Sequence, residues 1–244
     1  MTEPPAVPGR IYAIGDVHGA ARLLDRLLGR IEAECRADGV TAELVLMGDY
    51  VDRGDSSRDA LDLIASLGER PELAPVLLRG NHEEMLLDVV DGRAPAARWL
   101  RYGGLQTLLS YEVGGLAALG GGGGAAEDDL RAALADAMGP HLDLLRRLGS
   151  SHWRGNVFFA HAGADPDLPL GAQPESALIW GAAGFLERPR GDGNWVVHGH
   201  YVVDAPHAIE GRVAIDTGAY FSQRLTAVRI EGTALDFLTE TLDD

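Results

Sequence analysis

Five short polar motifs, each able to supply metal ligands, are spread along a chain of 244 residues. They combine Asp, His and Asn with glycine or alanine, and none of them contains cysteine. The motifs are Gly15-Asp16-Val17-His18-Gly19, Gly48-Asp49-Tyr50-Val51-Asp52-Arg53-Gly54, Gly80-Asn81-His82-Glu83, His161-Ala162-Gly163 and His198-Gly199-His200. Oxygen and imidazole donors without sulfur suit Mn, Fe or Zn ions. A pair of such ions commonly assists hydrolysis at phosphorus, so the motifs favour that class of chemistry.

The spacing of these residues indicates how two ions could share ligands. Asp16 and His18 are two residues apart, and in an extended segment such side chains point the same way, so both can bind one ion. Asp49 has two carboxylate oxygens, which can bridge two ions about 3.5–4 Å apart. Taken singly, each motif would also fit an ordinary turn with a surface histidine. Later motifs would complete the second ion's coordination through Asn81, His161 and His200.

Each polar motif follows a short apolar run that is typical of a buried strand. These strands are expected at residues 10–14, 44–47, 76–78, 157–160 and 195–197. Helices are expected between them, at residues 20–36, 56–67 and 83–90. Strands followed by helices predict an α/β protein. The motifs therefore stand just past the carboxyl ends of strands, where open α/β sheets place their ligands.

The remaining segments differ in character from this strand–helix pattern. Three consecutive strands, at residues 212–215, 225–230 and 234–239, predict an antiparallel portion and hence a mixed sheet or a second sheet. The middle of the chain, residues 94–148, is expected to be helical, with a flexible linker at the glycine run 120–124. We expect one domain over residues 10–244, preceded by a flexible, proline-rich tail of residues 1–9.

Composition excludes several other functions. A formal net charge of -16 argues against general nucleic-acid binding, which needs basic surface. All 21 basic residues are arginine, and the absence of lysine excludes a Walker-type NTPase and Schiff-base chemistry. No apolar run is long enough to span a bilayer. The single cysteine, Cys35, excludes an intramolecular disulfide and favours a reducing compartment, the cytoplasm. This arginine-only composition is also typical of a GC-rich bacterial genome.

The five motifs together resemble the phosphoprotein-phosphatase branch of the calcineurin-like metallophosphoesterases. The resemblance covers roughly residues 10 to 230, and the full string Gly-Asp-Tyr-Val-Asp-Arg-Gly favours this branch over generic phosphodiesterases. Weaker matches to bacterial members lie at residues 99–104 and 215–220. The resemblance implies an α/β fold in which mixed β-sheets are sandwiched between α-helices, as four α/β/β/α layers.

The resemblance also implies a role for each matched residue. The first of two divalent metal ions would be held by Asp16, His18 and Asp49, and the second by Asp49, Asn81, His161 and His200. Mn is the favoured metal, with Fe or Zn as alternatives. A metal-bridging hydroxide would attack phosphorus in line. His82 would protonate the leaving oxygen and Asp52 would hold His82. The substrate-binding residues would be Arg53, Asn81 and Tyr220.

Two positions need separate interpretation. His198 lies two residues before His200, and we expect it to pack at the strand end and not to bind metal. Relatives usually offer a second phosphate-binding arginine, in bacterial members often just after a tryptophan. Here Trp180 is followed by glycine and two alanines. The candidates that remain open for this role are Arg101, Arg188 and Arg190.

These observations leave three functional hypotheses. The leading one is a phosphomonoesterase that acts on phosphoserine or phosphothreonine in proteins. The second is a hydrolase of dinucleoside polyphosphates such as diadenosine tetraphosphate, which would gain support if residues 99–111 formed a basic and aromatic nucleotide pocket. The third is a non-catalytic phosphate-binding protein. The expected partner is accordingly a phosphoprotein or a phosphorylated small molecule, with no role for a membrane or nucleic acid.

Overall fold

Two five-stranded sheets form the centre of the computed structural model, which describes residues 3–114 and 124–242. The first sheet has the order β10-β9-β1-β2-β3 and the second has the order β4-β5-β6-β8-β7. The strands of the first sheet are β1 (Val7–Ile14), β2 (Ala42–Leu46), β3 (Leu73–Leu77), β9 (Arg224–Gly232) and β10 (Ala234–Thr241). Those of the second are β4 (His152–Arg154), β5 (Val157–Phe159), β6 (Trp195–His198), β7 (His207–Ile209) and β8 (Arg212–Ala214).

Both sheets are mixed, as the sequence predicted. β1, β2 and β3 run parallel to one another, whereas β9 pairs antiparallel with both β1 and β10. In the second sheet β5, β6 and β8 are parallel, and β4 and β7 pair antiparallel at its two edges. The expected strands at residues 212–215 and 225–230 belong to different sheets, so the antiparallel hairpin consists of β9 and β10 alone.

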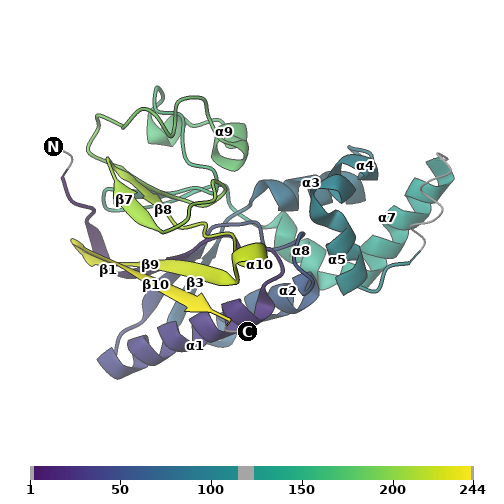
Figure 1. Ribbon diagram of the computed structural model, residues 1–244, viewed down its shortest axis with the longest axis horizontal. Helices are drawn as coiled ribbons and strands as arrows, with labels where there is room; N and C mark the ends of the chain where they lie inside the picture. The colour runs from purple at the N-terminus through teal and green to yellow at the C-terminus, as the bar shows by residue number, and fades with distance from the viewer. Residues whose placement is uncertain (1–2, 115–123, 243–244) are drawn as a thin grey trace.

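Helices cover the outer faces of the two sheets (Figure 1). Those of the first half are α1 (Ala21–Asp38), α2 (Ser57–Ala65), α3 (Asn81–Val90), α4 (Ala96–Trp99) and α5 (Leu105–Ser110), with the short turns η1 (Ser66–Glu69) and η2 (Leu100–Gly104). Later ones are α7 (Gly124–Met138), α8 (Pro140–Arg146), η3 (Leu170–Ala172), α9 (Glu175–Trp180) and α10 (Ala219–Ser222). The three predicted helices are confirmed, and the described parts of residues 94–148, residues 94–114 and 124–148, are mainly helical.

Three apolar clusters fill the interfaces between four layers, and alternation along the strands explains them. In β1, Tyr12 and Ile14 belong to the cluster under α1 and α2, whereas Ile11 and Ala13 face the second sheet. Successive strand residues point to opposite faces, so one buried strand serves two interfaces. In β5, Phe158 packs on the outer side beneath α9. The predicted four-layer α/β/β/α architecture is therefore confirmed.

The N-terminal strand begins earlier than expected. β1 starts at Val7, which pairs with Gly232, so the last three residues of the expected tail are part of the sheet. The backbone N–H of Ala6 donates to Oδ1 of Asn156 at 2.6 Å, which ties the preceding residue to the second sheet. The expected glycine linker 120–124 lies, except for its last residue, outside the described part of the chain. Within that described part, no helix has the length and apolarity needed to cross a membrane.

Candidate metal centre

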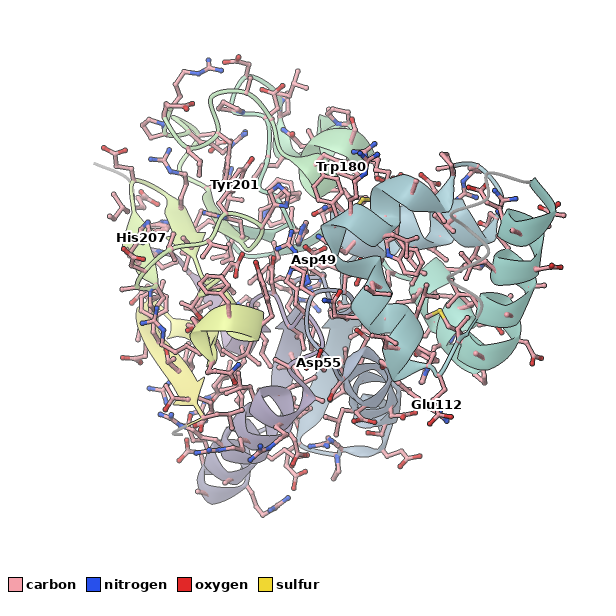
Figure 2. The ribbon with its side chains drawn as sticks, turned by 45° about the vertical axis from the view of Figure 1, so that its right-hand side comes forward. Asp49, Asp55, Glu112, Trp180, Tyr201 and His207 are labelled. Atoms are coloured by element: carbon pink, nitrogen blue, oxygen red, sulfur yellow. The ribbon has the colours of Figure 1, made fainter. Side chains whose placement is uncertain are left out.

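The six predicted metal ligands lie in loops or helix starts that follow strands of both sheets. Asp16 and His18 follow β1, Asp49 follows β2, Asn81 opens α3 after β3, and His161 and His200 follow β5 and β6. The first three strands belong to one sheet and the last two belong to the other. Carboxyl ends of parallel strands from both sheets therefore meet here. Figure 2 shows Asp49 near the middle of the molecule, between the sheets and the helices that begin with α3.

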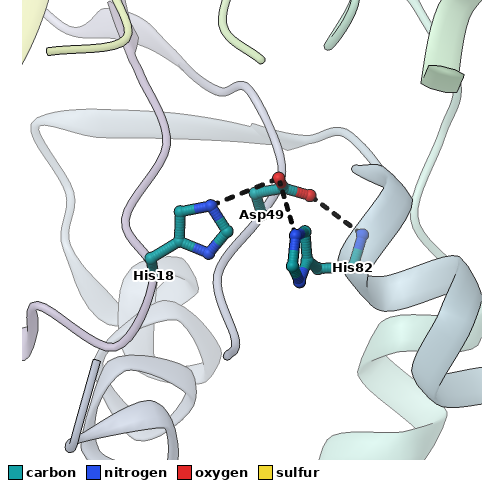
Figure 3. Close-up of side chains that lie close together, drawn as sticks. All are labelled: His18, Asp49 and His82. Atoms are coloured by element: carbon teal, nitrogen blue, oxygen red, sulfur yellow. Dashed lines mark hydrogen bonds and ion pairs between the residues drawn. The ribbon is translucent and has the colours of Figure 1, made fainter. Parts of the chain in front are cut away.

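Asp49 is shared by two groups of potential ligands. One group contains His18, Asp49 and His82, and the other contains Asp49, His161 and His200, with the donor atoms of each group within 4.8 Å of one another. Oδ2 of Asp49 lies 3.4 Å from Nε2 of His18. Figure 3 marks this interaction with a dashed line. The other oxygen of Asp49, Oδ1, lies 3.5 Å from Nε2 of His161. The two carboxylate oxygens thus face different groups, which is the arrangement expected of a bridging ligand.

The second group also includes the amide of Asn81. Its Oδ1 lies 3.1 Å from Nε2 of His161 and 3.0 Å from Nδ1 of His200. The two imidazole nitrogens are 3.2 Å apart. One neutral oxygen, two imidazoles and one oxygen of Asp49 therefore lie close to one another.

Asp16 lies beside these groups and is not a member of either. Its carboxylate accepts the backbone N–H of His200 at 3.1 Å, and its Oδ1 lies 3.9 Å from Nδ1 of His161. Burial, together with the neighbouring carboxylates of Asp216 and Asp49, raises the pKa of Asp16 well above its usual range. Asp16 is therefore close to the ligand groups. The buried carboxyl group of Asp216 beside it makes the ionised form of Asp16 less favourable.

Backbone strain is concentrated at these residues. Among the described residues, eight non-glycine residues have positive φ, and five of them are His18, Asp49, Asp52, Arg53 and His200, with φ between 42° and 71°. Conformations of this kind cost on the order of 1–3 kcal/mol each and gather at functional sites. The fold therefore retains unfavourable backbone geometry where the five motifs meet.

Two histidines have their tautomer fixed by the backbone. Nδ1 of His18 donates to the carbonyl of Val51 at 2.8 Å, and Nδ1 of His161 donates to that of Met47 at 3.1 Å. In each ring the Nε2 lone pair then faces Asp49, which is how metal-binding histidines are usually oriented. Burial lowers the pKa of His18 to about 3 and that of His200 to about 4. These imidazoles are thus neutral, as coordination requires.

The donor set fits two divalent cations. It combines the carboxylates of Asp16 and Asp49 with an amide oxygen and neutral imidazoles, all of them buried or half-buried. Burying carboxylates without compensating positive charge is very unfavourable, and cations would supply that charge. Nitrogen and oxygen donors without sulfur suit Mn, Fe and Zn alike.

His82 has a different environment from the other histidines. Its Nδ1 donates to Oδ2 of Asp52 at 2.7 Å. Its Nε2 is buried and has no hydrogen-bond partner within residues 3–114 and 124–242. Burial lowers the pKa of His82, but the carboxylates of Asp49 and Asp52 outweigh burial and raise it overall. One nitrogen is thus fixed by an acid while the other is directed toward the ligand groups, 4.0 Å from Oδ2 of Asp49.

Arg53 and Tyr220 stand together at the rim of the centre. The guanidinium of Arg53 lies 5.3 Å from the centroid of the Tyr220 ring, and its NH1 lies 3.2 Å from Nε2 of His18. Two pockets share this pair. One of about 390 Å³ is lined by Arg53, Arg101, Tyr102, Gly103, Gln106 and Tyr220. The other, of about 280 Å³, lies against the loop of residues 19–22.

Of the three candidate second arginines, Arg101 lines a pocket together with Arg53. Arg188 pairs with Asp167 at 2.7 Å, and Arg190 pairs with Asp192 at 2.6 Å. Both of these guanidiniums are therefore engaged by neighbouring carboxylates of the second half of the chain.

Comparison with known proteins agrees with this geometry. The sequence profile described as calcineurin-like phosphoesterase matches residues 9–204. The chain belongs to this family. It is accordingly a metal-dependent phosphatase-like hydrolase.

Three similar proteins illustrate the range of the family. A symmetrical bis(5'-nucleosyl)-tetraphosphatase from Thioalkalivibrio sulfidiphilus is 27% identical, over 93% of this chain and 97% of the relative. Serine/threonine-protein phosphatase 1 from Salmonella typhimurium is 37% identical, over only 38% of each chain. A solved structure of a putative diadenosine tetraphosphatase superposes with a TM-score of 0.60 at 21% identity, covering 96% of this chain and 95% of the other. This last likeness concerns the fold alone.

His198 lies outside both ligand groups of this phosphoesterase. It is buried, its ring packs edge-on against Phe185 with centroids 4.9 Å apart, and its Nδ1 is directed at the carbonyl of Gly199. The packing role predicted for His198 therefore agrees with its surroundings.

A pair of substitutions tests whether His200 or His198 is the metal ligand. His200→Ala is expected to lower the bound Mn by about half, because one of two ions loses an imidazole ligand. His198→Ala is the matched control, a change of the same side chain two residues away, and should leave the Mn content unchanged. Metal analysis of the dialysed proteins provides the measurement. Depletion in His198→Ala with full Mn in His200→Ala would reverse the assignment.

Sequence reasoning missed several residues that organise the centre. The buried carboxylate of Glu83 accepts the backbone N–H groups of Asp49, Tyr50 and Gly80 at 2.7–2.9 Å, so it joins the second and third motifs. Its place directly after His82 was the available signal. Asp216, which neighbours Asp16, lies within the weak match at residues 215–220. Trp99, which contacts Asp52, likewise opens the weak match at residues 99–104, whereas Thr107, its other partner, carries no comparable signal.

Proposed function

We propose that this phosphoesterase hydrolyses dinucleoside polyphosphates of the diadenosine tetraphosphate type. The observation that carries this proposal is the pocket of about 390 Å³ beside Arg53. Small-molecule sites typically span about 300–1,000 Å³. Two tyrosines, two arginines and a glutamine line this pocket, and three of these residues come from the range 99–111. The tetraphosphatase that matches the chain over nearly its whole length gives independent support.

Each side of the pocket suits one part of such a substrate. The exposed ring of Tyr102 and the ring of Tyr220 offer aromatic faces, on which a base can stack with about 1–3 kcal/mol of free energy. The guanidiniums of Arg53 and Arg101 suit phosphate oxygens, because their planar donors match that geometry. In this proposal Arg101 serves as the second phosphate-binding arginine.

Six side chains would hold the two ions. One ion would be bound by Asp16, His18 and Asp49, and the other by Asp49, Asn81, His161 and His200. When bound, divalent cations polarise phosphoryl oxygens and lower the pKa of water, so that a nucleophile forms at neutral pH.

The other residues of the site would handle the substrate and the proton. Arg53 binds phosphoryl oxygens next to the ligand groups, and Tyr220 supports its guanidinium from one side. His82 holds a proton on Nε2 and gives it to the oxygen that leaves phosphorus. Asp52 accepts the Nδ1 proton of His82 and so fixes the orientation of the ring.

Hydrolysis of phosphoserine or phosphothreonine in proteins is the second candidate. It was the leading hypothesis from sequence, and the Salmonella protein phosphatase, which matches over part of the chain, favours it. That match covers much less of the chain than the tetraphosphatase match does. A non-catalytic role has less support, because the Asp52–His82 pair and the ligand set are complete.

A substrate panel with Mn-loaded enzyme tests the proposal. We expect kcat/KM for diadenosine tetraphosphate to exceed that for a phosphoserine peptide. Tyr102→Ala should lower the former by about tenfold, as loss of one stacked base implies, and should leave p-nitrophenyl phosphate hydrolysis unchanged. Trp153→Ala, another exposed aromatic residue on β4, is the control. Preference for the phosphopeptide would favour the second candidate.

A further inference from the structure

The carboxylate of Asp52 is the centre of a buried hydrogen-bond network that reaches beyond the metal site. Besides His82, it accepts the indole N–H of Trp99 at 3.0 Å on Oδ1 and 2.9 Å on Oδ2. It also accepts the hydroxyl of Thr107 at 2.6 Å on Oδ1. Asp52, Trp99 and Thr107 are all buried, with exposed fractions of 0%, 1% and 0%. Solvent therefore does not compete for these bonds.

Thr107 is bonded to Asp52 in two ways. Its hydroxyl donates to the carboxylate, and the same oxygen accepts the backbone N–H of Asp52 at 2.9 Å. The Ser57 hydroxyl lies 3.2 Å from that backbone nitrogen and 3.2 Å from the Thr107 hydroxyl. Asp52 has a φ of 71°, so Thr107 bonds to both the side chain and the strained backbone of the residue that holds His82.

Both partners come from a segment without metal ligands, which is built around two glycines. α4 ends at Trp99 and α5 carries Thr107, with η2 between them. Gly103 has a φ of 113°, and its carbonyl accepts the backbone N–H of Arg53 at 3.2 Å. A Cβ on Gly104 would collide with the Trp99 ring. The glycines thus let this segment pack closely against Asp52 and Arg53.

Such a network has a consequence for His82. A buried carboxylate with a single partner can turn about its side-chain bonds, and the imidazole bonded to it would turn as well. Here both oxygens of Asp52 are held by donors other than His82, which leaves Oδ2 facing Nδ1 in one geometry. For metal-binding histidines, removing a group that fixes the ring orientation typically costs about 10–100-fold in affinity or activity.

We propose that Trp99 and Thr107 are positioning residues for proton transfer by His82. They hold the Asp52 carboxylate so that Nε2 of His82 stays directed at the oxygen that leaves phosphorus. This inference rests on the proposed general-acid role of His82. Residues 96–110 would then contribute to the orientation of His82 as well as to the pocket.

Leaving-group dependence distinguishes this role from a merely structural one. General-acid assistance matters most when the departing oxygen is a strong base, and contributes typically about 10²–10⁴-fold. Thr107→Val removes one donor with little change of shape, and Trp99→Phe removes the indole donor together with part of the buried ring. We expect either variant to lower kcat for phenyl phosphate by about tenfold or more, and kcat for 2,4-dinitrophenyl phosphate by less than about threefold. Thr107→Ser, which keeps the hydroxyl, should restore most of the phenyl phosphate activity.

Two control variants make the result decisive. Leu108→Val changes a buried neighbour of Thr107 that has no polar group, so any loss should be equal for both substrates. His82→Asn should show the full leaving-group dependence. Equal losses for both substrates in Thr107→Val and Trp99→Phe would overturn the positioning role alone. A His82→Asn enzyme without leaving-group dependence, or a wild type inactive on aryl phosphates, would count against the proposed function of the site as well.

Discussion

Asp49→Asn is expected to remove both metal ions and to reduce turnover by at least about 10³-fold, equivalent to roughly 4 kcal/mol. Both ligand groups share Asp49, and each of its oxygens faces a different group. An amide offers one oxygen in place of two and lacks the negative charge. The backbone N–H of His82, which donates to Oδ1 of Asp49 at 3.0 Å, can still donate to the asparagine oxygen. The fold should therefore survive the change.

Metal analysis and thermal unfolding of the purified variant would check this expectation. Asp55→Asn is the matched control, because it makes the same chemical change at an exposed position six residues further along the chain (Figure 2). The control should retain its metal content. An Asp49→Asn protein that keeps two ions would contradict the assignment of Asp49 as the shared ligand.

His82→Asn is expected to lower kcat for phenyl phosphate by about 10²–10⁴-fold while both ions remain bound. Asn retains a donor for Asp52 but cannot carry the proton to the leaving oxygen. The expectation is informative because His82 also falls within reach of the first ligand group, and its Nε2 lies 4.0 Å from Asp49. The geometry is thus compatible with two roles for His82, as a metal ligand or as the general acid.

Metal content separates those two roles. Steady-state kinetics and metal analysis on the same preparation of His82→Asn are sufficient. Loss of an ion in parallel with activity would identify His82 as a ligand and remove the general-acid assignment. Unchanged kcat with full metal content would exclude both roles.

The buried strands could be predicted because each is an apolar run that ends at glycine or at a polar motif. β4 and β7 could not, since each has three residues at a sheet edge and no apolar run: β4 is His-Trp-Arg and β7 is His-Ala-Ile. The sequence also did not indicate that residues 212–215 and 225–230 belong to different sheets. Hydrophobic alternation shows which residues are buried, but it does not show which sheet buries them.

The predicted ligands lie in short motifs of neighbouring residues, and such motifs can be recognised in the sequence alone. The network around Asp52 is different, because Trp99 and Thr107 lie 47 and 55 residues away from it along the chain. The second arginine was also left open. Arg188 is engaged by Asp167, a carboxylate 21 residues away that folding brings to it. Contacts of this kind depend on the packed structure and have no periodic signature.

The division of ligands between the two sheets has a consequence for how the protein matures. His161 and His200 follow strands of the second sheet, whereas the other predicted ligands belong to the first. A ribosome must therefore release the chain beyond residue 200 before a complete centre can exist. On these assignments the second ion can be bound only late in biogenesis, because a nascent or truncated chain carrying only the first three motifs lacks two of its four ligands.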